Sequence, residues 1–364
     1  MKSAFILGTR PEIIKLSPLI RHATRRKKPF ILIHTGQHYS YEMDTLFFKE
    51  LELPQPKYHL EIRSAESGGH AGHTGRMMTG IEKILLAARP AVVFVQGDTN
   101  SVLAGALATS KIHGMRLAHV EAGLRSYDRS MPEEINRVMA DHVSDFLFAP
   151  TLISKKNLLT EGIPKEKIFI TGNTIVDALR ENLMIAKKRI RNLNRWIRPG
   201  EDYFLMTLHR QENVDQKERL ALILKGLKLV VRKFNTKILF PIHPRTRKML
   251  EKFRITLPVG VLALEPVGFL DFLRLEEAAR LILTDSGGVQ EEACILGVPS
   301  VTIRTTTERP ETVLTGANLV AGFRPDSIVR CAEEMIRRKR NWKNPFGDGR
   351  AGERMLRIAE ERFS

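Results

Sequence analysis

The chain has 364 residues, of which 43% are hydrophobic and 27% charged, and this length favours two domains because a single core stops growing at about 250–300 residues. Two cysteines, Cys294 and Cys331, exclude a disulfide scaffold, and no apolar run reaches the roughly 20 residues that a transmembrane helix needs. The formal net charge of +17 suits an anionic small substrate better than nucleic acid, because no aromatic residues alternate with the basic runs.

The first half of the chain alternates short apolar runs with helical patterns. The opening run is too short for a signal peptide, so cytoplasmic residence without a membrane partner is the default expectation. The predicted strands are continuous apolar runs, as expected when helices cover both faces of a parallel sheet. They are Ala4–Leu7, Phe30–His34, Ala91–Gln96, Arg116–Glu121, Phe146–Ala149 and Ile168–Thr171. The predicted helices are Pro11–Arg26, Tyr41–Glu50, Gly72–Arg89, Ser101–His113, Glu133–Val143 and Leu152–Glu161.

The same pattern restarts after a long basic helix between Gly172 and Trp196. The predicted strands are Tyr203–Leu208, Lys237–Pro241, Val261–Leu264, Leu281–Thr284, Ser300–Ile303 and Asn318–Val320. The predicted helices are Gln216–Phe234, Pro244–Phe253, Gly268–Ala278, Val289–Leu296, Arg309–Leu314, Ser327–Arg338 and Asp348–Phe363. We therefore predict an α/β fold with two Rossmann-like, doubly wound parallel-sheet domains that face a central cleft. The domains are residues 1–172 and 173–345, and residues 346–364 form a helix that packs back on the first domain.

Carboxylates follow two neighbouring strands of the first domain. Glu121 ends the strand RLAHVE, and Asp98 follows the most apolar strand, AVVFVQ. Ligands of open α/β sheets bind beyond the carboxyl ends of the strands, and clustered carboxylates suit acid–base chemistry. Glu133, in the first helical turn after Pro132, could join them. Compensation of the helix dipole by Glu133 and N-capping by Asp98 are the structural alternatives.

Two further stretches of the first domain could contact a ligand. Gly8 ends the first strand, and Arg10 and Lys15 follow at a helix start that could hold an anion. Gly68–His73 is interpreted as a substrate-side loop ahead of a long helix. Its two histidines have no carboxylate or cysteine at ligand spacing, so we predict no metal site.

Two strand ends of the second domain carry histidines. His209 follows the strand YFLMT, and His243 follows the next strand. At a strand end, a histidine could bind a phosphate or transfer a proton. Two histidines at equivalent positions favour a functional role over a structural one.

A glycine-rich turn is the most specific signal in the second domain. Ser286, Gly287 and Gly288 stand between a strand and a helix, and their backbone N–H groups could bind a diphosphate at the helix N-terminus. Glu292 lies about one turn inside the helix, where it could accept a ribose hydroxyl. Arg309 begins a later helix.

Together, these residues resemble the non-hydrolysing UDP-N-acetylglucosamine 2-epimerases, which share the GT-B fold. The resemblance covers nearly the whole chain and rests on motifs that follow in family order. They are GTRPEIIK, QGDT, HVEAGLR, PEEINR, TGNTIVD, HRQEN, PIHPRT, TDSGGVQEEA and TERPE. It implies an isomerase and a homodimer, with UDP mainly on the second domain and the hexosamine reaching into the first.

The family mechanism is elimination followed by re-addition. UDP leaves C1 while a proton leaves C2, which gives 2-acetamidoglucal; the proton then returns to the opposite face and UDP re-adds. No cofactor is needed, because the proton is removed without oxidation. The resemblance implies that the catalytic residues are Asp98, Glu121, Glu133 and His209, with the acid and base roles undivided. It implies that the UDP or substrate contacts are Arg10, Lys15, His243, Ser286, Gly287, Gly288, Glu292 and Arg309.

One stretch departs from the family pattern. Bacterial members bind an activating second substrate molecule with a QHR-type stretch. Here Gln37 and His38 are present, but Tyr39 replaces the arginine and the spacing is longer. This departure leaves activation by substrate open.

Three other functions share parts of the pattern. A hydrolysing relative, which releases free N-acetylmannosamine and UDP, has most of the same motifs. A GT-B glycosyltransferase would not need three carboxylates in the first domain. A nucleic-acid-binding protein would show salt-sensitive affinity without competition from UDP.

Overall fold

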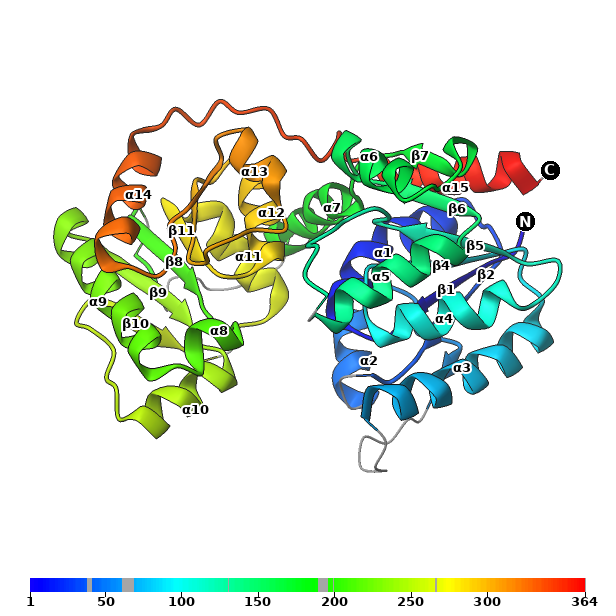
Figure 1. Ribbon diagram of the computed structural model, residues 1–364, viewed down its shortest axis with the longest axis horizontal. Helices are drawn as coiled ribbons and strands as arrows, with labels where there is room; N and C mark the ends of the chain where they lie inside the picture. Colours follow the sequence, from blue (N-terminus) through cyan, green and yellow to red (C-terminus); the bar gives the residue numbers. More distant parts are fainter. Residues whose placement is uncertain are drawn as a thin grey trace. The chain divides into compact units, whose positions relative to one another are not determined.

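The computed structural model describes residues 1–37, 41–60, 69–129, 131–188, 196–198, 200–265 and 267–363. The chain divides into two compact units, and Figure 1 labels most of their elements. Unit 1 comprises Met1–Glu181 and Phe346–Ser364, and unit 2 comprises Asn182–Pro345. Each unit has one parallel sheet whose strands are connected by helices, so the predicted class of two doubly wound α/β domains is confirmed.

The sheet of unit 1 has the order β3-β2-β1-β4-β5-β6-β7, and its adjacent strands are parallel. Its strands are β1 (Ser3–Leu7), β2 (Phe30–His34), β3 (Tyr58–His59), β4 (Val92–Gln96), β5 (Arg116–Val120), β6 (Phe146–Ala149) and β7 (Ile168–Ile170). Strands β1 and β4 are buried along their whole length because helices cover both faces. The strand order reverses between β1 and β4, which is where ligands of such sheets bind.

The helices of unit 1 include the last helix of the chain. They are α1 (Arg10–Arg25), α2 (Tyr41–Glu50), α3 (Gly69–Ala88), α4 (Asn100–Ser110), α5 (Pro132–Val143), α6 (Leu152–Thr160), α7 (Thr174–Lys188, which continues into unit 2), α15 (Ala351–Phe363) and the 3₁₀ turn η1 (Lys165–Lys167). Helix α15, red in Figure 1, packs against α1. Asp177 of α7 accepts the N–H groups of Ala351 and Gly352 at 3.2 and 3.0 Å, and so caps the start of α15.

Unit 2 repeats the arrangement with the strand order β10-β9-β8-β11-β12-β13, again parallel. Its strands are β8 (Tyr203–Thr207), β9 (Lys237–Pro241), β10 (Val261–Leu264), β11 (Leu281–Thr284), β12 (Ser300–Thr302) and β13 (Asn318–Val320). Its helices are α8 (Gln211–Val214), α9 (Lys217–Phe234), α10 (Pro244–Phe253), α11 (Phe269–Ala278), α12 (Gly287–Leu296), α13 (Pro310–Leu314) and α14 (Pro325–Arg337). The order reverses between β8 and β11.

The interpretation of Gly68–His73 as a loop is wrong for residues 69–73, because α3 begins at Gly69. Glycine lowers helix propensity by about 1 kcal/mol per residue, which is why the segment resembled a loop. Met77, Ile81 and Leu85 of α3 are buried, and the helix packs along α4. The free energy gained from this packing outweighs the low helix propensity of the glycines at the start of α3. None of the described helices combines the length and apolar character that crossing a membrane requires.

Candidate active site

The turn after β1 is shaped by the lack of a side chain at Gly8. A Cβ there would lie 1.9 Å from Thr35 Oγ1 and 2.5 Å from Ser101 Oγ, so only glycine fits. The N–H groups of Gly8 and Thr9 donate to Oε2 of Glu12 at 2.5 and 3.0 Å. These two donors, which we expected to help hold an anion, are therefore satisfied within the chain.

Glu12 is a buried carboxyl group at this strand end that the sequence interpretation missed. It forms a capping box with Thr9, and its Oε1 accepts the hydroxyl of Thr99, the residue after Asp98. Burial, opposed by these hydrogen bonds, raises the pKa of Glu12 to about 7. The spacing Thr9–Glu12 was the available signal, since a Thr-x-x-Glu pattern marks a capping box.

Glu121 lies directly after β5 in a conformation that non-glycine residues rarely adopt, with φ of 73°. Its side chain is buried and accepts hydrogen bonds from donors in α1, in β4 and in the segment before α7. Lys15 Nζ donates to Oε1 at 2.5 Å, Gln96 Nε2 to Oε2 at 2.5 Å, and Asn173 Nδ2 to Oε1 at 3.2 Å. The structure therefore joins predicted residues Lys15 and Glu121, and it adds Gln96 and Asn173, which were not predicted.

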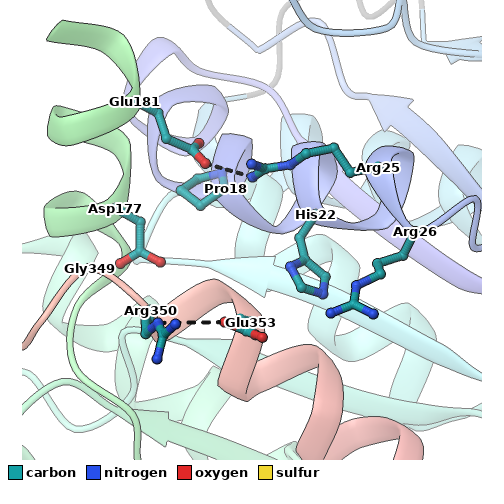
Figure 2. Close-up of a pocket in the computed structure, with 9 residues that line it drawn as sticks. All are labelled: Pro18, His22, Arg25, Arg26, Asp177, Glu181, Gly349, Arg350 and Glu353. Carbon is teal, nitrogen blue, oxygen red and sulfur yellow. Dashed lines mark hydrogen bonds and ion pairs between the residues drawn. The ribbon is translucent and has the colours of Figure 1, made fainter. Parts of the chain in front are cut away.

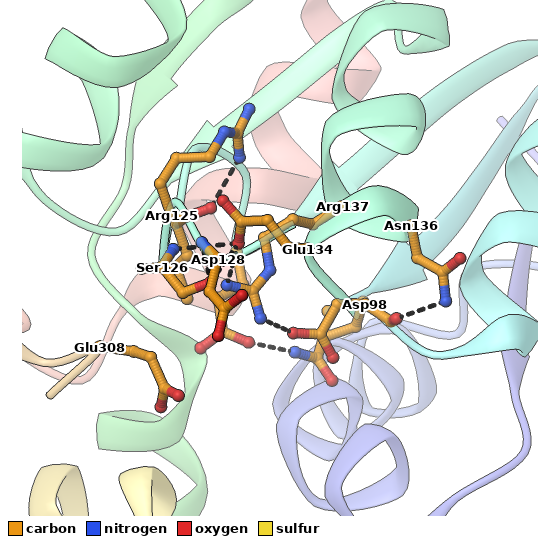
Figure 3. A network of polar contacts seen from close by, with 12 residues as sticks. Asp98, Arg125, Ser126, Asp128, Glu134, Asn136, Arg137 and Glu308 are labelled. Carbon is orange, nitrogen blue, oxygen red and sulfur yellow. Dashed lines mark hydrogen bonds and ion pairs between the residues drawn. The ribbon is translucent and has the colours of Figure 1, made fainter. Parts of the chain in front are cut away.

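Asp98 follows β4 and does not cap the next helix, because Thr99 is the N-cap of α4. Figure 3 shows that Arg137 of α5 contacts both Asp98 and Glu134. Asn136, from the same helix, donates to the backbone carbonyl of Asp98 at 2.9 Å. The side chain of Asp98 is 31% exposed, so it is open to a ligand while an arginine positions it.

The two neighbouring glutamates of α5 have opposite environments. Glu134 is buried and accepts the N–H groups of Ser126 and Tyr127 at 2.9 Å each, so it holds the preceding loop. Glu133 is exposed. Among the contacts of the described residues, none joins Glu133 to Asp98 or Glu121. A catalytic role of Glu133 therefore stays a prediction.

In unit 2, a buried aspartate organises the segment after β8. Asp285 is fully buried and accepts the backbone N–H groups of His209 and Arg210 at 3.0 and 2.9 Å. Its Oδ1 also lies 3.3 Å from Nδ1 of His209. Burial lowers the pKa of His209, although the charge of Asp285 opposes this shift. Asp285 was missed because the sequence interpretation began the functional turn at Ser286.

His243 is the N-cap of α10. Its Nδ1 accepts the N–H of Arg245 at 3.2 Å, so the neutral ring carries its proton on Nε2. The rings of His209 and His243 lie 5.5 Å apart, centroid to centroid. Burial, helped by the charge of Arg245, lowers the pKa of His243. The structure thus brings the two predicted histidines together.

The glycine-rich turn forms the start of α12, as predicted. Ser286 is the N-cap, and its hydroxyl accepts the N–H of Val289 at 3.5 Å. A Cβ at Gly287 would lie 3.1 Å from Oε2 of Glu308, so this carboxylate stands next to the helix N-terminus. Burial of Glu308 is outweighed by its arginine neighbours, Arg210 first, which lower its pKa. The carboxylate of Glu308 therefore already occupies the position, beside a helix N-terminus and several arginines, that would also suit a phosphate.

The remaining predicted contacts of unit 2 lie on α12 and at the start of α13. Glu292 is half-buried on α12 and faces the fully buried Glu276 of α11. The pKa of Glu276 is raised well above its usual value, first by burial and then by the negative charge of Glu292. Arg309 Nε lies 2.9 Å from Oε1 of the buried Glu291. Arg309 is therefore anchored on the helix that begins with the glycine-rich turn.

Three further predictions concern a metal site, the stretch that begins at Gln37, and Arg10. In the described part of the chain, no group of three or more His, Cys, Asp or Glu residues could hold a metal ion. Gln37 accepts the backbone N–H of Ser101 at 2.9 Å, whereas His38 and Tyr39 lie outside the described residues. Arg10 lies over the ring of Phe47, with its guanidinium carbon 5.3 Å from the ring centroid.

A pocket of about 360 Å³ in unit 1 lies away from these residues (Figure 2). Its lining comes from α1, α7 and the start of α15, including Arg25, Glu181 and Glu353. None of the candidate site residues lines it. The candidate residues of each unit therefore lie at the strand ends of that unit's own sheet and not in this pocket.

Known proteins resemble this chain over nearly its whole length. The family model described as UDP-N-acetylglucosamine 2-epimerase matches residues 22–360. The UDP-N-acetylglucosamine 2-epimerase of Methanocaldococcus jannaschii is 56% identical over 364 residues, which cover 98% of each chain. The UDP-2,3-diacetamido-2,3-dideoxy-D-glucuronate 2-epimerase of Pseudomonas aeruginosa is 41% identical over 340 residues, or 92% of each chain. A crystal structure of the M. jannaschii enzyme in complex with UDP-GlcNAc and UDP has 55% identity and a TM-score of 0.89, and covers 99% of this chain and 100% of that one.

Proposed function

This chain belongs to the UDP-N-acetylglucosamine 2-epimerase family, and we propose that it interconverts UDP-N-acetylglucosamine and UDP-N-acetylmannosamine without hydrolysing either. Its relatives are named as epimerases, which are isomerases, so the predicted enzyme class is confirmed. The observation that carries the proposal is Glu121, a buried carboxylate held by Lys15 at a strand end beside the switch point of the sheet.

We propose that unit 1 acts on the sugar. Proton transfer at C2 requires groups on both faces of the ring, because the proton leaves one face and returns to the other. Asp98, Glu121 and Glu133 supply these groups. Glu121 is fixed by its three donors, and Asp98 is positioned by Arg137, so both carboxylates are oriented before a substrate binds.

We propose that unit 2 binds UDP. The N–H groups of Gly287 and Gly288, together with the hydroxyl of Ser286, bind the diphosphate at the start of α12, whereas the N–H of Ser286 donates to Thr284 at 2.9 Å. Glu292 accepts a ribose hydroxyl. His209, oriented by Asp285, assists the departing phosphate. Retention of UDP after it leaves C1 allows re-addition, which distinguishes an epimerase from its hydrolysing counterpart.

Incubation with UDP-N-acetylglucosamine in heavy water tests the reaction and its outcome. We expect deuterium at C2 of both UDP-sugar epimers, with no accumulation of free sugar. Deuterated free N-acetylmannosamine would identify the hydrolysing reaction instead, and absence of exchange at C2 would reject both. The same assay should also be run with UDP-2,3-diacetamido-2,3-dideoxy-D-glucuronate as the offered substrate, because a 41% identical relative is named for it.

A matched pair of variants links the activity to the proposed site. Glu121→Gln removes the charge of the buried carboxylate and should abolish exchange at C2. Glu82→Gln makes the same change on the exposed side of α3 and should leave exchange unchanged. A homodimer and cytoplasmic residence stay predictions; sedimentation of the purified chain tests the first.

A further inference from the structure

A chain of four charged side chains, of which three are buried and Glu161 is partly exposed, adjoins the strand ends that carry Asp98 and Glu121. It runs from His119 of β5 to Asp141 of α5, then to Arg125 of the loop after β5, and ends at Glu161 after α6. His119 and Asp141 are fully buried, and the side chain of Arg125 is 1% exposed. No member of this chain is among the proposed catalytic or UDP-binding residues.

Both ring nitrogens of His119 face hydrogen-bond acceptors. Nδ1 lies 2.6 Å from Oδ1 of Asp141, and Nε2 lies 2.8 Å from the backbone carbonyl oxygen of Gly97. A carbonyl oxygen cannot donate a proton. The other carboxylate oxygen of Asp141 already accepts from Arg125 at 2.7 Å and from the N–H of Gly123 at 3.1 Å. Two acceptors around one imidazole are both satisfied only when the ring carries two N–H groups.

The charges of the four side chains also indicate that the ring of His119 is doubly protonated and positively charged. Arg125 also makes two hydrogen bonds of 2.6 Å to the two oxygens of Glu161. Arg125 is shared between the buried Asp141 and the partly exposed Glu161. With a neutral ring at His119, the fully buried Asp141 would therefore share a single cation with a second carboxylate, which is costly. A positive ring at His119 completes two ion pairs. Burial by itself lowers the pKa of His119, but Asp141 and the hydrogen bond to Gly97 outweigh it and raise the pKa above its usual value.

This ion pair connects the two turns that carry the proposed catalytic carboxylates. Gly97, the carbonyl partner of His119, directly precedes Asp98 and has a left-handed backbone with φ of 84°. Gly123, the N–H partner of Asp141, lies two residues after Glu121. A Cβ at Gly123 would lie 2.3 Å from the carbonyl oxygen of Ser154, so this turn packs directly against the backbone of α6 and has no room for a side chain. Movement of the ion pair would therefore displace both turns.

We propose that His119 is a buried imidazolium and that, together with Asp141, it is a positioning residue that fixes the turns of Asp98 and Glu121 relative to each other. The effect of His119 on catalysis rests on the proposed function. The charge of the His119 ring does not, because this charge follows from the hydrogen-bond partners of the ring alone.

Nitrogen NMR of the wild-type chain labelled with ¹⁵N-histidine measures the charge state directly. The sequence has 11 histidines, and pH 8.5 lies about two units above the ordinary pKa of an imidazole, so a ring without a buried anionic partner is expected to be neutral there. We expect one ring to keep the nitrogen shifts of a doubly protonated imidazolium at this pH. Neutral shifts for every ring would overturn the proposal, and this measurement does not depend on any variant folding.

His119→Gln tests the positioning role. Glutamine cannot donate to both Gly97 and Asp141 in the geometry of the ring, and it carries no charge. We expect the imidazolium signal to disappear and kcat to fall by about 10-fold or more, with KM changed less than about twofold, since UDP is bound by residues of unit 2. The acid limb of the kcat profile should move to higher pH, because the carboxylates lose a neighbouring positive charge.

His142→Gln is the matched control, because His142 is the exposed residue that follows Asp141 on α5. It should keep kcat, the pH profile and the imidazolium signal. Asp141→Asn removes the other half of the ion pair and should likewise abolish the imidazolium signal and lower kcat. It should not move the acid limb to higher pH, because a negative charge is removed together with the positive one. An unchanged kcat and pH profile in a folded His119→Gln chain would overturn the positioning role. If the wild-type chain had no epimerase activity, the proposed function would fail and the nitrogen shifts alone would decide the proposal.

Discussion

Lys15 and Glu121 are 106 residues apart in the sequence, yet the ammonium of Lys15 donates to the carboxylate of Glu121 at 2.5 Å. Both side chains are buried, with 11% and 5% of their surface exposed. The pair joins α1 to the end of β5, on the two sides of the point where the strand order of unit 1 reverses. It therefore ties together the two strand ends between which a ligand of such a sheet binds.

Removal of the positive charge should destabilise this site. In Lys15→Met, Glu121 keeps its amide donors but loses its cation, and a buried ion pair that loses one partner costs about 3–5 kcal/mol. We expect urea unfolding of the variant at a lower midpoint and a large loss of exchange at C2. Lys83→Met, on the exposed face of α3, is the control and should change neither. An unaffected unfolding midpoint in Lys15→Met would contradict the importance of the pair.

Asn173 should prove sensitive to charge. Its side-chain amide donates to Glu121 at 3.2 Å, and its carbonyl oxygen accepts the N–H of Ile175 at 3.1 Å. Asn173→Asp keeps the acceptor for Ile175 but places a second carboxylate against Glu121. We expect kcat to fall by about 10-fold to 100-fold through like-charge repulsion. Asn235→Asp, at an exposed helix end where both residues tolerate the backbone, should have normal kinetics.

Asp285 should control the titration of His209. The charge of Asp285 raises the pKa of His209, against the larger effect of burial, which lowers it. Asp285→Asn should therefore lower this pKa further and move the His209-dependent limb of the pH–rate profile to lower pH. We also expect kcat to fall by about 100-fold as the ring loses its orientation. Asp202→Asn, at an exposed ion pair, is the control. If the pH–rate profile of Asp285→Asn did not shift, titration of His209 would not be the cause of the observed pH dependence.

Glu12 should make stability depend on pH in an unusual direction. Its pKa is raised from 4.5 to about 7 in the folded chain, so folding favours the neutral acid. This contribution is fully present below pH 4.5 and is lost as pH rises through 7. The shift corresponds to about 3 kcal/mol.

Glu12→Gln removes this titration. Relative to the wild type, the variant should therefore gain about 3 kcal/mol of unfolding free energy between pH 4.5 and pH 8, as measured by urea unfolding at each pH. Glu82→Gln, on the exposed face of α3, should follow the wild type. A difference between wild type and Glu12→Gln that stays constant with pH would contradict the raised pKa.

Local patterns were sufficient to locate most strands and helices. Continuous apolar runs such as Val92–Gln96 predict buried parallel strands, and the residues after them, Asp98 and Glu121, were therefore expected at the edge where ligands bind. The same approach failed for α3, where tertiary packing outweighs the weak helix propensity of glycine. It also missed the two-residue strand β3, which is too short to have a periodicity.

Contacts between distant segments could not be predicted in this way. Asp285 resembles any residue at a strand end, and only the pairing of β8 with β11 places it beneath the N–H groups of His209 and Arg210. Likewise, Glu133 and Glu134 are adjacent and chemically alike. Their positions on the helix turn Glu134 toward the backbone of the preceding loop and leave Glu133 exposed.

The sequence by itself determined the α/β class, the alternation of elements and the strand ends at which polar groups gather, because these depend on hydrophobic periodicity and local turn chemistry. Only the tertiary structure decided the partners of those groups: Lys15 with Glu121, Arg137 with Asp98, and Asp285 with His209. The physical reason is that burial and charge pairing depend on strand order and register. These bring together side chains that are separated by tens of residues in the sequence.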